Sequence, residues 1–195
     1  MNTLELVAVG DDVEQARIVA RALAGTVFVV LRADASGLPF RAMVTAVTDD
    51  AETLLAAAGV GAYVVCRRIM KPRAAAGGPV APAIELPGVI GLFPMVRHPG
   101  LSHGQADRHW RDVHAPLALK HHVAMSHYTQ LSVVHRLHGP DWDGFALCGF
   151  DSIEDLRERF FESDQGRVAI REDVARFADT RSSPRRVIVT EERYG

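Results

Sequence analysis

Histidine is the residue type with the greatest potential for chemistry in this 195-residue sequence. All nine histidines lie between His98 and His138, and four of them fall within RHWRDVHAPLALKHH, residues 108–122. Imidazole titrates near neutral pH and is also a common metal ligand. The cluster could therefore hold a metal ion, transfer protons, or form a polar surface.

Spacing separates His114 from the other histidines. Trp110, Val113, His114 and Leu117 recur at helical intervals as one apolar stripe, which predicts a helix with His114 on its buried side. Pro116 lacks an N–H, so we expect the helix to kink or restart there. A histidine just before such a break could point into a cavity as a general acid/base. It could equally cap the carbonyls that the proline leaves free, and the residues alone leave both roles open.

The stretch HHVAMSH, residues 121–127, invites a metal interpretation. His121 and Met125 can share one helical face, and a thioether with imidazole would suit copper. The stretch contains no Asp, Glu or Cys, and the sequence has no HExxH motif. We therefore expect no metal site. The remaining histidines are expected at the surface, on the helix flank or beside a turn: His98, His103, His109, His135 and His138. His98 could alternatively meet a carboxylate or phenolate together with Arg97.

The next apolar stretch, HYTQLSVVHRL, predicts a strand whose side chains alternate between two faces. The first face is polar but uncharged, which suits a cavity that orients a ligand through a few hydrogen bonds. Tyr128 and Gln130 on this face are predicted to bind substrate, although an ordinary solvent-facing strand is the alternative. The opposite face is expected to pack under helices, and it carries His127, Thr129, Leu131 and Val133.

Three further residues are candidate parts of a cavity, and Trp110 is expected to shape its wall. Phe93, on a strand before the histidine helix, could supply apolar wall. Arg97, close to the end of that strand, could meet a carboxylate or phenolate, although a surface position is the alternative. Trp142 lies in the turn PDWDG and could cover either the cavity or a barrel core.

The elements that position these residues follow one plan twice. Residues 73–87, rich in Ala, Gly and Pro, indicate a linker between residues 1–72 and 88–195. Each unit has the predicted order β-α-β-β-α-β, which is the ferredoxin-like motif of an α+β fold. We expect the two antiparallel sheets to pair into an α/β barrel around a cavity, within one chain or in a homodimer. Ser102 and Gln105 form a capping-box pattern where the histidine helix begins.

Composition limits the classes of function. Hydrophobic residues make up 48% and charged residues 24%, and the net charge is −2. These values favour a packed globular domain and give no electrostatic footprint for nucleic acid. No apolar run is long enough to span a membrane and no secretory signal is evident, so we expect a cytoplasmic protein. Cys66 and Cys148 lie in strand-like runs and are predicted to be buried free thiols. Dinucleotide, Walker and nucleophile-elbow motifs are missing, so no cofactor is expected.

The C-terminal half, from Gly88 to Glu192, resembles the EthD family of the dimeric α/β-barrel superfamily. The resemblance is carried by HPGLSHGQADRHWRDVHAPLALK, YTQLSVV, WDGFALCGFDSIEDLRERF and VIVTEE. It implies a ferredoxin-like fold that forms barrels and binds small, mostly apolar molecules. Some such proteins dehydrate, cyclise or decarboxylate aromatic polyketide intermediates without a cofactor, and others are accessory proteins.

The resemblance places His114 at the histidine of the family's VHAPL motif, and with it we predict that His114 is a general acid/base. The predicted function is cofactor-free acid/base chemistry on a small aromatic or polyketide-like substrate. The alternatives are a non-catalytic carrier or accessory protein and a cofactor-independent monooxygenase.

Overall fold

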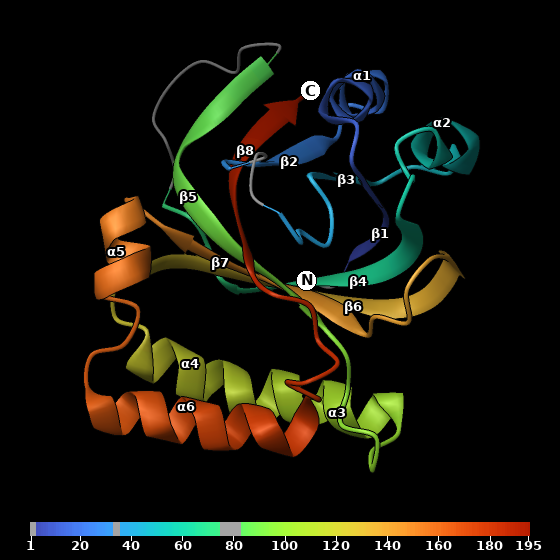
Figure 1. Ribbon diagram of the computed structural model, residues 1–195. Coiled ribbons are helices and arrows are strands. Elements are labelled where there is room, and N and C mark those ends of the chain that lie inside the picture. The colour runs from blue at the N-terminus through green and yellow to red at the C-terminus, as the bar shows by residue number, and fades with distance from the viewer. Residues whose placement is uncertain (1–2, 33–35, 75–82) are drawn as a thin grey trace.

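The computed structural model describes residues 3–32, 36–74 and 83–195. Its eight strands form one closed barrel in which every neighbouring pair is antiparallel (Figure 1). The strands are β1 (Thr3–Gly10), β2 (Thr26–Val30), β3 (Ala42–Ala46), β4 (Gly61–Lys71), β5 (Ala83–Met95), β6 (Met125–His138), β7 (Gly144–Phe150) and β8 (Val187–Tyr194). The expected α+β barrel is therefore confirmed.

The helices cover the outside of the barrel on two sides. The smaller set is α1 (Val13–Ala22) and α2 (Ala51–Leu55), and the larger set lies across another side (Figure 1). The larger set is α3 (His103–His109), the π-helical turn η1 (Trp110–His114), α4 (Ala115–His121), α5 (Ile153–Glu158) and α6 (Asp164–Phe177). None of the helices in the described ranges has the length and apolar character needed to cross a membrane.

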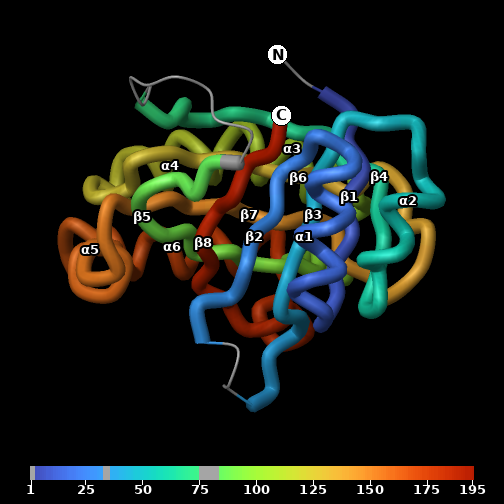
Figure 2. Tube along the Cα trace, turned by 90° about the horizontal axis from the view of Figure 1, so that it is seen from above, coloured from blue at the N-terminus to red at the C-terminus, as the bar shows by residue number. Residues whose placement is uncertain are grey.

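The barrel closes within a single chain. Its strand order is β4-β1-β3-β2 in the N-terminal half and β8-β5-β7-β6 in the C-terminal half. Two antiparallel seams join the halves, β2 with β8 and β4 with β6, and Figure 2 shows β2 running beside β8. The predicted linker, residues 73–87, lies partly outside the described residues, and from Ala83 onward the chain belongs to β5.

Buried hydrophobic side chains fill the barrel interior. The prediction of a cavity inside the barrel is therefore wrong. Leu131 and Val133 belong to this interior core and do not pack under helices, which corrects the predicted assignment of the two faces of β6. Because both faces of a barrel wall are buried here, alternation could not tell the interior from the helix-covered face. The core also contains Phe28, Tyr63, Phe145, Leu92 and Val189.

Two carboxylates, on β1 and β8, are paired with guanidinium groups. Arg67 Nε lies 2.7 Å from Glu5 Oε1, and Arg73 Nη2 lies 2.7 Å from Glu191 Oε2. Both carboxylates are buried, so each needs its guanidinium partner to offset the loss of water.

The histidine-bearing helix restarts as α4 at Ala115, with Pro116 in its first turn, as expected, but without an interruption of the helical conformation. The capping box at Ser102 and Gln105 is present, and the chain stays helical from His103 to His121 through the π-helical turn. In that turn the Ala115 N–H donates to the Trp110 carbonyl five residues earlier. The wider turn accommodates a proline, which has no N–H to give to the preceding turn.

Candidate functional site

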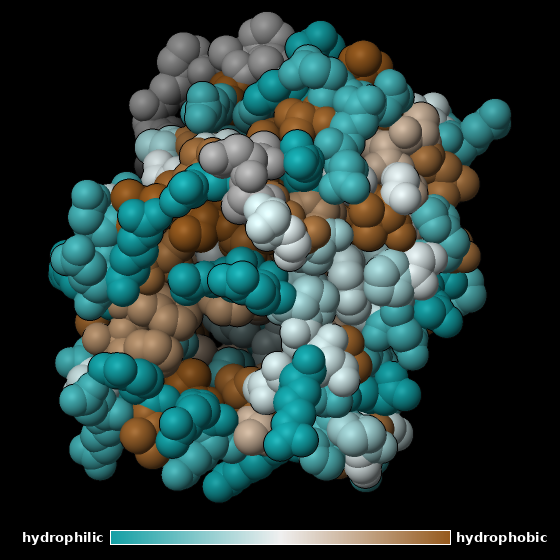
Figure 3. Space-filling model, viewed as in Figure 1, coloured by the Kyte–Doolittle hydropathy of each residue, from teal (hydrophilic) through white to brown (hydrophobic). Residues whose placement is uncertain are grey.

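A cavity of about 270 Å³ lies between the outer face of the C-terminal strands and the helix layer. Figure 3 shows the surface hollowed between these two layers, in the lower half of the view. The described residues that line the cavity include no Lys, Arg, Asp or Glu. Its walls are therefore mainly apolar, and they include Phe93, Met95, Ala146, Phe160, Ile170, Val174 and Phe177.

One face of the histidine helix lines the cavity with residues four positions apart. These residues are Trp110, His114, Ala118 and His122. Val113, which was expected on the buried stripe, is instead 48% exposed, because the π-helical turn shifts the phase of the helix. Ala118, which lies between His114 and His122 on this face, contributes only a methyl group to the cavity wall.

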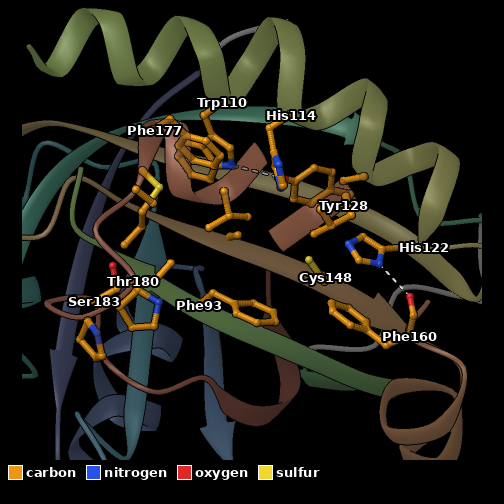
Figure 4. Close-up of a pocket in the computed structure, with 18 residues that line it drawn as sticks. Phe93, Trp110, His114, His122, Tyr128, Cys148, Phe160, Phe177, Thr180 and Ser183 are labelled. Atoms are coloured by element: carbon orange, nitrogen blue, oxygen red, sulfur yellow. Dashed lines mark hydrogen bonds between the residues drawn. The ribbon is translucent and has the colours of Figure 1, made fainter. Parts of the chain in front are cut away.

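His114 is held by a carboxylate from α6. Its Nδ1 lies 2.9 Å from Asp173 Oδ2, and the imidazole is one-tenth exposed. A carboxylate accepts, so Nδ1 carries a proton, and a ring with this single proton has a free lone pair on Nε2. No hydrogen bond to Nε2 occurs among the described residues, and His114 lies along the cavity in Figure 4.

Asp173 also binds a second histidine. His109 Nε2 lies 2.8 Å from Asp173 Oδ1, and both imidazole rings pack on Phe177. Burial raises the pKa of Asp173, but the hydrogen bonds from His114 and His109 outweigh that effect and leave the pKa below its usual value. Asp173 is therefore an anion that can stabilise a positive charge on His114.

Tyr128 contributes a hydroxyl group to the cavity wall beside His114 (Figure 4). Its oxygen accepts hydrogen bonds of 3.0 Å from Trp110 Nε1 and from Gln130 Nε2. The same Gln130 nitrogen donates to the Trp110 carbonyl at 3.1 Å, and that carbonyl fixes the orientation of the amide. Both lone pairs of the phenol oxygen are therefore used, and its own O–H remains a donor. Burial raises the pKa of Tyr128, so the hydroxyl keeps its proton.

Gly144, the first residue of β7, leaves room for the Trp110 ring. A Cβ atom at Gly144 would lie 2.6 Å from Cζ3 of Trp110, which is closer than any side chain tolerates. Trp110 is 2% exposed and forms the cavity wall next to Phe177. Gly144 thus fixes how deeply the indole sits against the sheet.

His122 is the second imidazole of the cavity and was not predicted to line it. Its Nδ1 donates to the Phe160 carbonyl at 2.7 Å, and its ring stacks on that of Phe160 at 4.2 Å. Burial lowers the pKa of His122 to about 4. The ring is therefore neutral near pH 7, with Nε2 as an acceptor.

The two cysteines are free thiols, Cys148 buried and Cys66 only half-buried. Cys148 lines the cavity, and burial raises its pKa to about 12. A thiol of this kind is protonated near neutral pH and acts as apolar wall.

Four of the seven predicted site residues line the cavity: His114, Trp110, Tyr128 and Phe93. Gln130 lies just behind them through its hydrogen bonds to Trp110 and Tyr128. Arg97 and Trp142 lie elsewhere. The Arg97 guanidinium pairs with Asp143 at 2.7 Å, and Trp142 packs in the barrel interior with ring centroids 6.0 Å from Tyr63.

Sequence reasoning missed Asp173 and His122. Asp173 lies on the same helical stripe as Ile170 and Phe177, and a carboxylate on an apolar stripe was the available signal. His122 ends the stripe of four-residue spacing that begins at Trp110.

The histidines of residues 121–127 do not converge on a metal. Within the described ranges, no three or more His, Cys, Asp or Glu side chains are grouped as metal ligands. His121 Nδ1 pairs with Glu162 at 2.5 Å, and His127 Nε2 lies 3.0 Å from Arg73 Nη2. Each imidazole therefore has its own partner.

Comparison with known proteins identifies a shared fold and a domain match within the C-terminal half. No curated protein matches the sequence. A solved structure described as an anthrone oxidase-like protein is 12% identical, with a TM-score of 0.54, over 99% of this chain and 92% of that chain. A candidate monooxygenase from Lactobacillus acidophilus NCFM is 8% identical, with a TM-score of 0.46, over 97% and 92% of the two chains.

The first of these structures shares the barrel fold with this chain, and at such low identity the likeness shows the fold alone. In the sequence, residues 98–181 match the model of the EthD domain. That range contains Trp110, His114, His122, Tyr128 and Asp173. The match to the EthD domain at residues 98–181 lies in the C-terminal half, where the sequence motifs predicted it.

Proposed function

We propose that the protein is a cofactor-free enzyme that moves a proton on a small aromatic or polyketide-like molecule bound in this cavity. The observation that carries the proposal is the His114–Asp173 pair, whose free Nε2 belongs to a side chain lining an apolar cavity. A buried imidazole oriented by a carboxylate is the arrangement of a general base.

The residues of the cavity suggest a sequence of proton transfers. His114 Nε2 would remove a proton from a carbon next to a carbonyl group, and the imidazolium formed would be stabilised by Asp173. The free O–H of Tyr128 would donate to the carbonyl oxygen as it becomes an enolate. Return of the proton from His114 to a hydroxyl leaving from the adjacent carbon would complete a dehydration and release water. Attack of the enolate carbon on a second carbonyl, which takes up that proton, would complete a cyclisation.

The remaining cavity residues would hold the ring system of the substrate. Trp110 and Phe93 would form the walls, and Gln130 would orient the Tyr128 hydroxyl. Arg97 and Trp142 are left out of this proposal, because the first is paired with Asp143 and the second is in the barrel core.

Substitution of His114 by alanine tests the proposal. We expect kcat to fall about 10²–10⁴-fold while the barrel stays folded, since general acid/base catalysis contributes that much. Turnover is measured by product formation from a panel of aromatic polyketide-like substrates. Intact turnover in His114→Ala would refute the role of His114. If no compound is turned over by the wild type and His114→Ala only weakens binding, the carrier alternative replaces the enzyme.

A cofactor-independent monooxygenase is the second candidate, because the fold neighbour is described as anthrone oxidase-like. Proton removal by His114 would again come first, and the resulting carbanion would react with dioxygen. The CH₂ group would become a carbonyl, and the second oxygen atom would leave as water. Oxygen uptake during turnover of an anthrone-like substrate distinguishes this reaction from a dehydration or cyclisation, which consumes none.

We also propose that the barrel consists of two ferredoxin-like units, residues 1–72 and 88–195. The repeated strand order, fourth-first-third-second within each half, supports this division. The barrel needs no second chain to close, because both seams lie within one chain.

A further inference from the structure

We infer that His122 selects ligands that present a hydrogen-bond donor, such as a phenolic hydroxyl, at the end of the cavity beside Phe160. This inference rests on the proposed function in one respect only, that the cavity takes up a small aromatic ligand. It adds the polarity that the far end of the ligand must have.

The geometry fixes which nitrogen of His122 is available. Nδ1 is used by the Phe160 carbonyl at 2.7 Å, and the ring is clamped by stacking on Phe160 at 4.2 Å. A carbonyl can only accept, so the proton is on Nδ1 and Nε2 has the lone pair. In Figure 4 this second nitrogen points to the side of the ring that faces Cys148 and Tyr128. None of the described residues donates to it.

The surroundings keep this nitrogen an acceptor. His122 is 4% exposed, and burial is the main cause that lowers its pKa to about 4, with a smaller contribution from His114. A neutral ring whose Nδ1 proton is already used can only accept from a ligand. A ketone, an ether or a carboxylate would place an oxygen lone pair against the lone pair of Nε2, which is repulsive. A hydroxyl would instead donate a hydrogen bond to Nε2.

The two imidazoles mark two separate ends of the ligand. They are eight residues apart on one helix, so their backbones are roughly 12 Å apart along its axis at 1.5 Å per residue. Ala118 lies between them, and Phe93 and Ile170 belong to the intervening walls. The lining has no charged side chain among the described residues, so a neutral fused-ring phenol fits it better than an aromatic carboxylate.

The ligand preference can be measured without any turnover. The probes are 2-naphthol and 2-methoxynaphthalene, which share a ring system and differ in one donor, with 2-naphthoate as the charged comparison. Titration calorimetry with the full chain is expected to give a Kd for the naphthol roughly tenfold or more below those of the ether and the carboxylate. Equal affinity of the wild type for naphthol and ether would overturn the inference, whatever any variant does.

Three variants locate the donor contact. His122→Phe keeps a ring to stack on Phe160 but lacks the nitrogens, so the naphthol is expected to bind no better than the ether. His114→Ala and His121→Gln are expected to keep the tenfold preference, since the first removes the other free acceptor of the cavity and the second changes a neighbour that pairs with Glu162. Loss of the preference in His114→Ala with retention in His122→Phe would place the hydroxyl at His114 and overturn the inference.

The outcomes separate this inference from the proposed function. A preference that depends on His122 supports the inference even if no compound is ever turned over and His114 proves inactive. Binding of no neutral aromatic probe to the wild type would overturn both. Turnover that depends on His114 together with equal binding of naphthol and ether would overturn the role of His122 alone.

Discussion

Alanine dominates the contact between α1 and the N-terminal strands, whereas histidine and aromatic residues line the space between α4, α6 and the C-terminal strands. Ala16 and Ala20 of α1 pack on strand residues such as Ala8, Ala42 and Ala46, and all five are nearly or fully buried. On the other side, Trp110, His114, Phe160 and Phe177 surround a cavity of about 270 Å³.

The difference shows that side-chain size and shape at the helix–sheet contact, and not the strand order, determine where a cavity forms. Small methyl groups let a helix approach the sheet closely and fill the space. Bulky planar rings between the C-terminal helices and strands leave an unfilled volume, which is the cavity. The same strand order can therefore carry a closely packed helix layer in the N-terminal half and a cavity in the C-terminal half.

The largest expected effect is on turnover, from Asp173→Asn. The amide has no charge to stabilise imidazolium on His114, so we expect kcat to fall about 10²–10⁴-fold with little change in KM. Asp12→Asn is the matched control in the N-terminal half, where Asp12 caps α1 and asparagine caps equally well. Steady-state kinetics check both variants. A similar loss of turnover in Asp12→Asn would mean that the N-terminal half also takes part in the chemistry.

The next effect is on acid stability. The pKa of His122 is lowered to about 4 in the folded protein and is near 6.5 when unfolded, so the unfolded chain binds the proton first as the pH falls. The free energy of unfolding should therefore decrease below about pH 6.5, by about 1.4 kcal/mol for each pH unit down to the folded pKa. Urea unfolding at several pH values should give a shallower decrease for His122→Phe.

Because all the histidines lie in the C-terminal half, acid should destabilise that half first, which tests the comparison between the two halves. Residues 1–97 contain no histidine, and His127, with its pKa also lowered to about 4 by burial, lies on β6. Hydrogen exchange at pH 5 should therefore show α4 losing protection before α1. Simultaneous loss in both helices would show that the halves unfold as one cooperative unit.

A pair of identical substitutions compares packing in the two halves directly. Ala20→Leu adds volume to a filled contact and should cost about 1–3 kcal/mol of unfolding free energy. Ala118→Leu places the same volume in the cavity, so we expect a smaller loss of stability together with a loss of 2-naphthol binding. Urea unfolding and calorimetric titration give both quantities. Equal destabilisation by the two variants would contradict the packing difference.

The smallest expected effects are at the helix starts. Ser102→Ala removes the capping box of α3, and Asp12→Ala removes the cap of α1, at a cost of about 1 kcal/mol each. Thermal or urea unfolding should show similar losses. A much larger loss for Ser102→Ala would indicate that the position of the histidine helix, and not only its first turn, depends on that cap.

Local patterns in the sequence predicted the parts of the site that depend on neighbouring residues. Alternation along β6 placed Tyr128 and Gln130 on one face, and the VHAPL motif indicated His114. Asp173 is 59 residues from His114, and only the packing of α6 against the histidine helix brings the two side chains together. No local periodicity encodes such a contact.

The error about the two faces of β6 has the same physical origin. Pro116 was expected to kink or restart the helix, and the change takes the form of a π-helical turn followed by α4, which begins at Ala115. Trp142 was predicted to cover either the cavity or the barrel core, and closure of the barrel places it in the core against Tyr63. A single strand cannot indicate which of its buried faces will become the interior of a barrel.

Because the barrel closes through β2–β8 and β4–β6 within one chain, its two walls can change independently. In a barrel made of two identical subunits, every substitution would appear twice and alter both walls together. Here a substitution in α1 changes one wall and leaves α4 untouched, so the wall that lines the cavity can change while the other retains its packing. The ligand stoichiometry that follows for this cavity is one molecule per chain.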